Sequence, residues 1–171
     1  MDCTIRPCKL DDAESMAELL NNKKIMDNLR DGLPYPYTAD DAREYINFIL
    51  NSDKNSTFAF AIVYEEKVVG CVGVFRQDNV YYRTAEMGYY VGEKYWNMGI
   101  ATCAIRKVCK NVFDNTNIIR IYAEPFARNI ASCRVLEKAG FTCEGTLRSS
   151  IVKNGIIEDS KIYAIIKEIK I

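Results

Sequence analysis

Apolar positions in the first fifty residues follow the period of amphipathic helices. They recur three and four positions apart over residues 13–20 and again over residues 42–50, which predicts a helix in each stretch. Thr38, before the second helix, is a residue type that caps helix N-termini. Residues 31–37 contain two prolines and a glycine, so we expect them to be irregular. A short strand is expected ahead of the first helix, at residues 4–5.

The middle of the chain changes to runs of β-branched and aromatic residues. Residues 58–64 and 68–75 are rich in such side chains, and only the short segment 65–67 separates them. This pattern is typical of an antiparallel hairpin. Another strand is expected at residues 85–91.

The pattern then alternates between helix and strand. Apolar positions over residues 101–112 predict a helix that begins after Gly99. Residues 118–123 predict a strand. Residues 129–139 predict a further helix, which Gly140 is expected to end, because glycine readily takes the left-handed conformation found at helix C-termini.

The C-terminal segment contains Asn154-Gly155, a strong signal for a tight hairpin turn between two final strands. The order of predicted elements mixes helices and strands throughout. It predicts an α/β (α+β) fold with a mixed sheet, in a single domain that spans residues 1–171.

Composition limits the chemistry that the chain can perform. There are 23 basic and 23 acidic residues, which gives no support for nucleic acid or an anionic membrane as a partner. The absence of histidine excludes Cys–His and Ser–His nucleophiles and most zinc sites, and no metal is expected. The seven cysteines contain no CxxC pair and are most simply small buried hydrophobes. With no membrane-length apolar run and no signal-peptide core, a cytoplasmic location is expected.

Candidate chemistry concentrates in residues 86–102, which are predicted to form a strand, a loop and a helix N-terminus. Free backbone N–H groups and the positive end of the helix dipole make such a helix start suitable for a phosphate. Gly99 lets a ligand approach the backbone closely, and Ala101 is small. The loop matches neither the Walker A pattern nor GxGxxG. A plain turn is the alternative interpretation, since one glycine is weak evidence.

Three motifs give the chain a resemblance to a known family. Residues 96–101 resemble the pyrophosphate loop Q/R-x-x-G-x-G/A of the GNAT acetyltransferases, with Trp96 in its first position. Residues 129–141 resemble the helix N-x-x-S-x-x-V-L-E-K-x-G-F of the branch that contains ribosomal-protein-alanine N-acetyltransferases. Residues 28–38 are similar to the substrate-side loop of that branch. The resemblance covers essentially the whole chain.

The resemblance implies a splayed central sheet of about seven strands flanked by about four helices, with acetyl-CoA in the gap between the fourth and fifth strands. Backbone groups near Tyr90 and Val91 are expected to pair with the pantetheine arm. Asn129 is expected to bond a pantetheine amide, although a helix N-cap explains an asparagine there equally simply. The backbone amides expected to hold the pyrophosphate are those of Asn97, Met98, Gly99, Ile100, Ala101 and Thr102.

Amide formation requires a neutral amine, so a base must remove a proton. Glu86 lies where many family members carry a strand glutamate that serves as the base; a solvated or salt-bridged carboxylate is the alternative. Position 136, where many relatives have a tyrosine that serves the leaving thiolate, holds Leu136, which cannot donate a proton. Ser132, one helical turn earlier, is the substitute that the branch suggests, unless its hydroxyl only bonds back to a helix carbonyl.

The implied activity is transfer of the acetyl group of acetyl-CoA to a primary amine. A protein N-terminal amine is one acceptor class, and a small molecule such as a polyamine, an aminoglycoside or an amino acid is another. A non-catalytic acyl-CoA-binding module is the alternative from a different class, which the leucine at position 136 makes conceivable. The expected partners are acetyl-CoA and the acceptor, and a homodimer is allowed.

Overall fold

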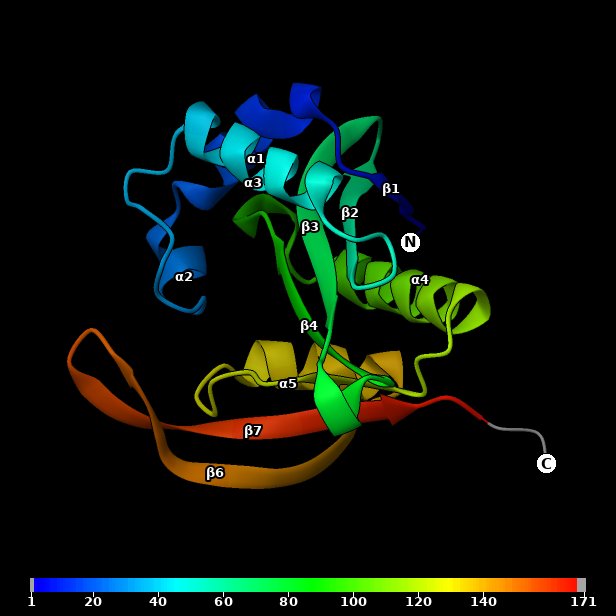
Figure 1. Ribbon diagram of the computed structural model, residues 1–171. Coiled ribbons are helices and arrows are strands. Elements are labelled where there is room, and N and C mark those ends of the chain that lie inside the picture. Colours follow the sequence, from blue (N-terminus) through cyan, green and yellow to red (C-terminus); the bar gives the residue numbers. More distant parts are fainter. Residues whose placement is uncertain (1, 169–171) are drawn as a thin grey trace.

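A computed structural model describes residues 2–168 of the chain (Figure 1). Its centre is one mixed sheet of seven strands in the order β1-β2-β3-β4-β5-β7-β6. The β4–β5 pair is parallel, and the other neighbours are antiparallel. The strands are β1 (Thr4–Pro7), β2 (Thr57–Tyr64), β3 (Lys67–Arg76), β4 (Thr84–Val91), β5 (Arg120–Ala123), β6 (Thr142–Lys153) and β7 (Ile156–Ile166).

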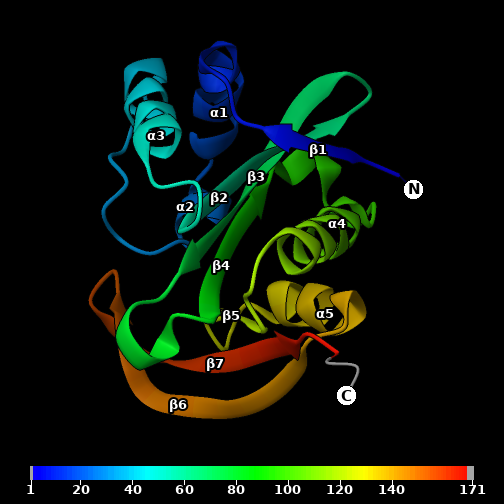
Figure 2. The same ribbon diagram turned by 45° about the vertical axis from the view of Figure 1, so that its right-hand side comes forward.

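Helices cover both faces of the sheet (Figure 2). Helices α1 and α3 pack together on one face, and α4 and α5 pack together on the other. Four longer helices were expected, and the short α2 was not predicted; its Ile25 is nevertheless buried in the core beside α1. The helices are α1 (Ala13–Leu20), α2 (Lys23–Met26), α3 (Ala39–Asn51), α4 (Ile100–Asn115) and α5 (Ile130–Ala139).

Two clusters of buried side chains lie on opposite faces of the sheet. The larger one, under α4 and α5, includes Met87, Ile105 and Leu136. The smaller one, under α1 and α3, includes Met16 and Ile46. A fully buried aliphatic side chain contributes roughly 1.5–3 kcal/mol, so both clusters hold their helices against the sheet.

The junction between β4 and β5 is short. Only three residue pairs form the parallel ladder, and the last of them joins Glu86 to Tyr122. Beyond Glu86, β4 continues to Val91 and stays paired with β3, whereas β5 ends at Ala123. The sheet therefore splays at this junction, as the resemblance implied.

Local signals in the sequence predict most of the turns and caps correctly. Thr38 and Asp41 form a capping box at the start of α3. Gly140 ends α5 with φ of 104°. Asn154 and Gly155 both have positive φ and join β6 to β7. These predictions are confirmed because each depends on residues close together in the chain.

Two details differ from the expectations. The apolar face of α3 was expected to include Leu50, but this side chain, one residue before the end of the helix, is 50% exposed. The strand expected at 118–123 begins at Arg120; Ile118 is fully buried but lies in the connection ahead of the strand.

The structure bears on the expectations about membrane spans, metal sites and cysteines. None of the helices within residues 2–168 has the length and apolar character needed to cross a membrane. Within the same residues, no three metal-ligating side chains lie together. The seven cysteines are free thiols, and five of them are buried, which confirms that most act as small hydrophobes.

Candidate active site

Strand β4 presents different side chains to the two faces of the sheet, since successive side chains of a strand point to opposite faces. Met87 and Tyr89 pack with the core under α4 and α5, whereas Tyr90 packs with the core under α1 and α3. Glu86 and Gly88 lie four and two positions before Tyr90, so they are on the same face of the sheet as Tyr90. The candidate base therefore lies on the α1/α3 face, at the last pair of the β4–β5 ladder.

Glu86 is paired with Arg30, which reaches it from the irregular segment after α2. Arg30 Nη2 donates a hydrogen bond to Glu86 Oε1 and lies 3.6 Å from Glu124 Oε2. The side chain of Glu86 is 22% exposed. Burial, followed by the negative charges of Glu86 and Glu124, raises the pKa of Tyr122. Two carboxylates thus share one guanidinium at the point where the sheet opens. Sequence reasoning placed Arg30 in a loop motif but did not predict this contact.

The segment that carries Arg30 is bonded to residues that lie beyond the β4–β5 junction. Arg128 donates to the Asp27 carbonyl oxygen at 2.6 Å and to Asn28 Oδ1 at 2.8 Å. Lys153 Nζ lies 2.6 Å from a carboxylate oxygen of Asp31. Contacts on both sides of Arg30 therefore hold it near Glu86, although the segment has little regular structure.

A hollow of about 260 Å³ adjoins this group of charges. Arg30 and Glu124 line one part of it, and Phe126, Val152 and Lys153 line another. The hollow therefore combines charged and apolar surface. It lies on the same face of the sheet as Glu86.

Gly88 leaves further space on that face. A Cβ placed on Gly88 would meet no heavy atom within 4 Å, and the residue is exposed. Because Gly88 follows Glu86 on the same face of β4, the region beside the carboxylate is open on the strand side as well.

Ser132 lies on the opposite face, in the first turn of α5. Its Oγ is 2.7 Å from the hydroxyl of Tyr89, so it is held by a side chain of β4. Burial raises the pKa of the Tyr89 phenol to about 12, and the hydrogen bond with Ser132 partly opposes that rise. Leu136 is fully buried in the core, one turn further along α5. Tyr89 was not identified from the sequence. The available signal was the alternation along β4, which directs the side chains of Tyr89 and Glu86 to opposite faces of the sheet.

Backbone groups of β4 face the gap at alternate positions. Gly92 N donates to Val69 O on the β3 side, whereas Ile119 N donates to Arg83 O on the β5 side. Even-numbered residues of β4 therefore bond toward β3, and odd-numbered residues face β5 and then the gap. Val91 O points this way too and accepts a 2.7 Å hydrogen bond from the indole of Trp96.

This alternation bears on the pantetheine contact predicted at Tyr90. Tyr90 has even parity, so its backbone groups are directed to β3, where it lies opposite Cys71. Its side chain is directed to the α1/α3 face, and its hydroxyl is buried with no protein partner among residues 2–168. The geometry favours Tyr89 and Val91 for main-chain contacts in the gap.

The predicted phosphate loop forms a left-handed turn into α4. Asn97 and Gly99 have φ of 63° and 76°. A Cβ on Gly99 would meet no atom within 4 Å. Cys103 N makes the first helical bond, to Gly99 O, so the amides from Gly99 to Thr102 precede the helical ladder. The side chain of Ile100 is buried, and only its backbone is available to a ligand.

The other three loop positions lie beside this helix start. Met98 and Ala101 are partly buried against the larger core cluster, and Thr102 is half-buried in the first turn of α4. The backbone amides of these residues, rather than their side chains, are therefore the groups that the phosphate prediction concerns.

Asn129 caps α5. Its Oδ1 accepts a 3.1 Å hydrogen bond from Ser132 N. The capping interpretation is therefore correct for the carboxamide oxygen. Its amide nitrogen donates to no protein acceptor in the part of the chain that the structure describes, so a ligand contact remains compatible with the cap.

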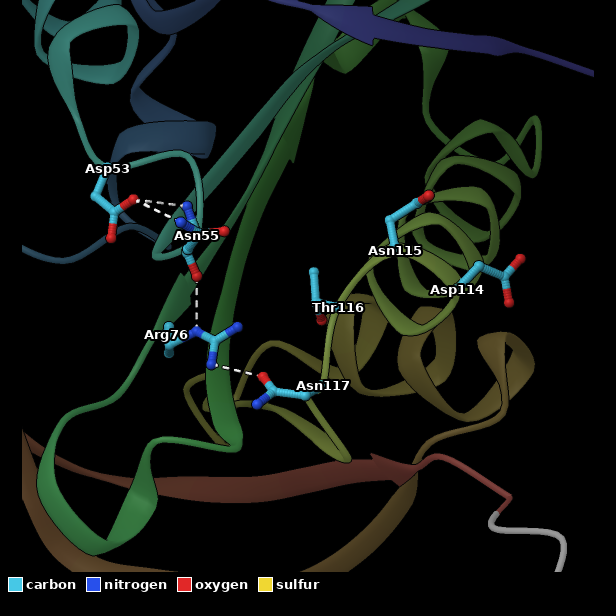
Figure 3. A pocket seen from close by; sticks show the side chains of 7 residues that line it. All are labelled: Asp53, Asn55, Arg76, Asp114, Asn115, Thr116 and Asn117. Carbon is cyan, nitrogen blue, oxygen red and sulfur yellow. Dashed lines mark hydrogen bonds between the residues drawn. The ribbon is translucent and has the colours of Figure 1, made fainter.

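A larger hollow, of about 650 Å³, lies elsewhere (Figure 3). It is found at the C-terminal end of α4, and none of the predicted site residues lines it. The guanidinium of Arg76 dominates its wall and donates to Asn55 O at 2.7 Å and to Asn117 Oδ1 at 2.8 Å. The smaller hollow fits the predicted chemistry better, because Arg30, which lines it, is paired with the candidate base Glu86.

The sequence profile of the acetyltransferase (GNAT) domain matches residues 2–142. The chain belongs to the GNAT acetyltransferase family. YdaF of Bacillus subtilis, provisionally named a ribosomal N-acetyltransferase, is 30% identical over 168 residues, which cover 96% of this chain and 91% of YdaF.

Two solved structures share the fold. The ribosomal L7/L12 α-N-protein acetyltransferase RimL, in complex with coenzyme A, has a TM-score of 0.86 at 20% identity and covers 98% of this chain and 95% of its own. Spermidine N-acetyltransferase of Vibrio cholerae, with CoA and spermine, has a TM-score of 0.81 at 24% identity and covers 97% and 96%. This GNAT protein is an acetyl-CoA-dependent N-acetyltransferase, with acetyl-CoA as its co-substrate.

Proposed function

We propose that this GNAT enzyme transfers the acetyl group directly to a primary amine of a protein N-terminus. One observation carries the proposal. Glu86 and the Tyr89–Ser132 pair lie on opposite faces of β4, three residues apart, at the place where the β4–β5 ladder ends. A base on one side and a hydroxyl on the other suit an amine that attacks and a thiolate that departs.

The residues around the gap fit acetyl-CoA. Backbone groups of Tyr89 and Val91 would bond the pantetheine arm, and the amide nitrogen of Asn129 would add a side-chain contact. The amides from Asn97 to Thr102 would hold the pyrophosphate, and the open space at Gly99 lets the phosphates approach. Acetyl-CoA supplies the acetyl group as a thioester whose sulfur leaves as a thiolate.

Glu86 would remove the proton from the acceptor amine, directly or through a water. An alkylammonium group has a pKa of about 10.4, so most of the acceptor is cationic at neutral pH. The carboxylate attracts this cation and accepts its proton. Arg30 occupies the same carboxylate in the structure, so the acceptor must displace the guanidinium or share the carboxylate with it.

Charge around the hollow supports a cationic acceptor. Arg30 and Lys153 line the hollow and Arg128 lies over the ring of Phe126, and each of the three is paired with a carboxylate. None of the three is therefore directed at an acidic substrate. The apolar surface of the exposed Val152 supports a peptide end over a bare amine, because side chains that follow the N-terminus would bury it.

A small polyamine is the second candidate. The observation that favours it is the pair Glu86 and Glu124, two carboxylates that share the single cation Arg30. A molecule with two ammonium groups would neutralise both carboxylates. A non-catalytic acyl-CoA-binding module is the third candidate, and it predicts CoA binding without turnover.

An acceptor screen tests these candidates. Peptides with the N-terminal sequences of ribosomal proteins, polyamines, aminoglycosides and amino acids are incubated with acetyl-CoA, and free thiol and acetylated product are measured, the latter by mass spectrometry. Acetylation of peptides at the α-amine supports the proposal. Selective acetylation of polyamines replaces it with the second candidate, and binding of acetyl-CoA without thiol release supports the third.

Four further expectations belong to this proposal. We propose that residues 1–171 act as one acetyltransferase domain in the cytoplasm, without nucleic-acid or membrane partners. A homodimer also remains a prediction, which sedimentation or light scattering of the purified chain would test.

A further inference from the structure

Tyr89 and Ser132 form a hydroxyl pair that bridges β4 and α5. The two oxygens lie 2.7 Å apart, although 43 positions separate the residues in the chain. A second contact, from the Tyr89 hydroxyl to the Ser132 carbonyl oxygen, is longer at 3.4 Å. The hydroxyl–hydroxyl bond is therefore the dominant interaction.

The direction of this bond follows from acidity. A phenol, with an ordinary pKa of about 10, is a better hydrogen-bond donor than an aliphatic alcohol. When Tyr89 donates to Ser132 Oγ, the serine proton is free to point elsewhere. A serine in a helix would otherwise donate back to a carbonyl one turn earlier. Accepting the bond from Tyr89 releases Ser132 from that arrangement.

We propose that Tyr89 is a positioning residue, whose phenol orients the Ser132 hydroxyl so that it donates a hydrogen bond to the leaving thiolate of CoA. This inference rests on the proposed function, in which Ser132 serves the sulfur. It supplies a replacement for the tyrosine that relatives carry at the position of Leu136. The assistance begins at Tyr89 of β4 and reaches the sulfur through Ser132, rather than coming from a tyrosine of α5.

The pair stabilises the thiolate by hydrogen bonding and does not transfer its proton. Burial raises the pKa of Tyr89 to about 12. An ordinary alkyl thiol has a pKa of about 8.5, so the phenol keeps its proton when the thiolate forms. The amine nitrogen forms a C–N bond with the carbonyl carbon of the thioester, the C–S bond breaks, the sulfur takes that electron pair, and the amine proton passes to Glu86.

Other titratable groups lie near Tyr89 and must be separated from its effect. The thiol of Cys133, next to Ser132 on α5, is the group whose charge bears on Tyr89. Behind it, Tyr163 of β7 donates a 2.9 Å hydrogen bond to Glu137. Ionisation of any of these groups would change the binding of every CoA analogue, whether or not it contains sulfur.

The experiment compares CoA with desulfo-CoA, which lacks the sulfur. Dissociation constants of both are measured by calorimetry from pH 6.5 to pH 9. A site that stabilises the thiolate makes CoA bind progressively better than desulfo-CoA as the pH rises. Titration of protein groups affects both ligands and cancels in the ratio of their affinities. The readout needs no acceptor and no turnover.

Tyr89→Phe removes the hydroxyl and keeps the ring. We expect it to lower the affinity ratio at pH 9 by at least about threefold, as expected for one lost hydrogen bond. Ser132→Ala should lower the ratio at least as much, and Tyr89→Phe added to Ser132→Ala should have no further effect. In turnover, Tyr89→Phe should lower kcat and leave the KM for acetyl-CoA within about twofold. Tyr45→Phe, at a tyrosine that packs with the α1/α3 core, is the matched control and should change neither quantity.

The outcomes are separable. A pH-independent ratio in the unchanged protein, or a normal ratio in Tyr89→Phe, overturns the inference even if amines are acetylated. If Tyr89→Phe lowers the affinity ratio equally in the unchanged protein and in Ser132→Ala, the phenol does not act through the serine and the inference is overturned. If the ratio behaves as expected but no amine is acetylated, the thiolate site stands and the proposed function fails. Thermal unfolding of each variant shows whether it folds. If Tyr89→Phe does not fold, Ser132→Ala still tests whether the site stabilises the thiolate.

Discussion

Arg30 and Glu86 are joined by a hydrogen-bonded ion pair, although 56 positions separate them in the chain. The guanidinium comes from the irregular segment after α2, and the carboxylate comes from the strand that borders the gap. In the proposed reaction, a cationic acceptor approaches this same carboxylate. Arg30 is therefore a competitor for the acceptor.

Removing this competitor should strengthen the binding of a cationic acceptor. We expect Arg30→Gln to lower the KM for a good acceptor about two- to fivefold, the range that corresponds to a partly exposed ion pair. The effect should shrink at high salt, because salt screens exposed charges. Steady-state kinetics at two ionic strengths measure it, with Arg43→Gln on α3 as the control. A rise in KM would show that Arg30 binds the acceptor or orders its segment.

Replacing the candidate base should cost activity in a pH-dependent way. Glu86→Gln keeps the size of the side chain but removes its charge and basicity. We expect kcat/KM to fall by a factor on the order of 10², with a smaller defect at high pH, where more acceptor is already neutral. A pH–rate profile measures this, and acetyl-CoA affinity should stay near normal.

The control for this variant is Glu66→Gln, in the exposed turn between β2 and β3. It should leave the profile unchanged. A Glu86→Gln protein that keeps most of its rate at neutral pH would mean that Glu86 is not the base, and that the enzyme relies on positioning an amine that is already neutral.

Gly99 and Gly155 offer a matched pair of substitutions. Both have φ of 76°, and a Cβ on either would meet no atom within 4 Å. Valine at each position should destabilise the fold by roughly 1–2 kcal/mol, because this backbone region is unfavourable for L-residues. Only Gly99→Val should also weaken acetyl-CoA binding, by at least about tenfold, because its side chain enters the space beside the start of α4. Calorimetry and urea unfolding separate the two effects. Equal affinities would remove the phosphate-loop assignment.

Asp12 links stability to pH away from the active site. Its side chain is only 3% exposed and accepts two 2.7 Å hydrogen bonds from Arg6. Burial alone would raise the pKa of Asp12, but the bonds from Arg6 and from Lys9 N outweigh it and hold the pKa below its usual value. The stabilising contribution is therefore present above the unfolded pKa of about 3.9 and is lost as the pH falls through the folded pKa.

Asp12→Asn should accordingly lower the free energy of unfolding at pH 7 by about 1–3 kcal/mol, since it breaks a largely buried pair. The difference from the unchanged protein should narrow below pH 4. Urea titrations at pH 7 and pH 3 measure both values, with the exposed Asp11→Asn as the control. A difference that stays constant across this range would contradict the assigned role.

The sequence predicts those parts of the fold that depend on local patterns. The capping box at Thr38, the left-handed Gly140 and the Asn154-Gly155 turn each need only a few neighbouring residues. The residues of the candidate site were also located by motifs, because the loop before α4 and the start of α5 are contiguous segments.

The sequence does not predict contacts between distant segments. The Arg30–Glu86 pair depends on where the segment after α2 is tied down, and no periodic pattern encodes that. The Tyr89–Ser132 pair depends on the packing of α5 against β4. The direction of the backbone groups of Tyr89 and Tyr90 depends on strand register, which the sequence shows only through alternation, so the sequence alone does not decide which of the two faces the gap.

The three-pair ladder between β4 and β5 also bears on how rigid the sheet is without its ligand. Few main-chain bonds connect the two halves of the sheet, so an extended ligand that bonds to Tyr89 and Val91 of β4 and to Asn129 at the start of α5 would act as a crosslink between the two halves. Saturating CoA should then slow hydrogen exchange at the odd-numbered amides of β4 that face the gap. At a hundred times the dissociation constant, it should also raise the free energy of unfolding by about 2.7 kcal/mol. The co-substrate would in this sense complete the sheet that binds it.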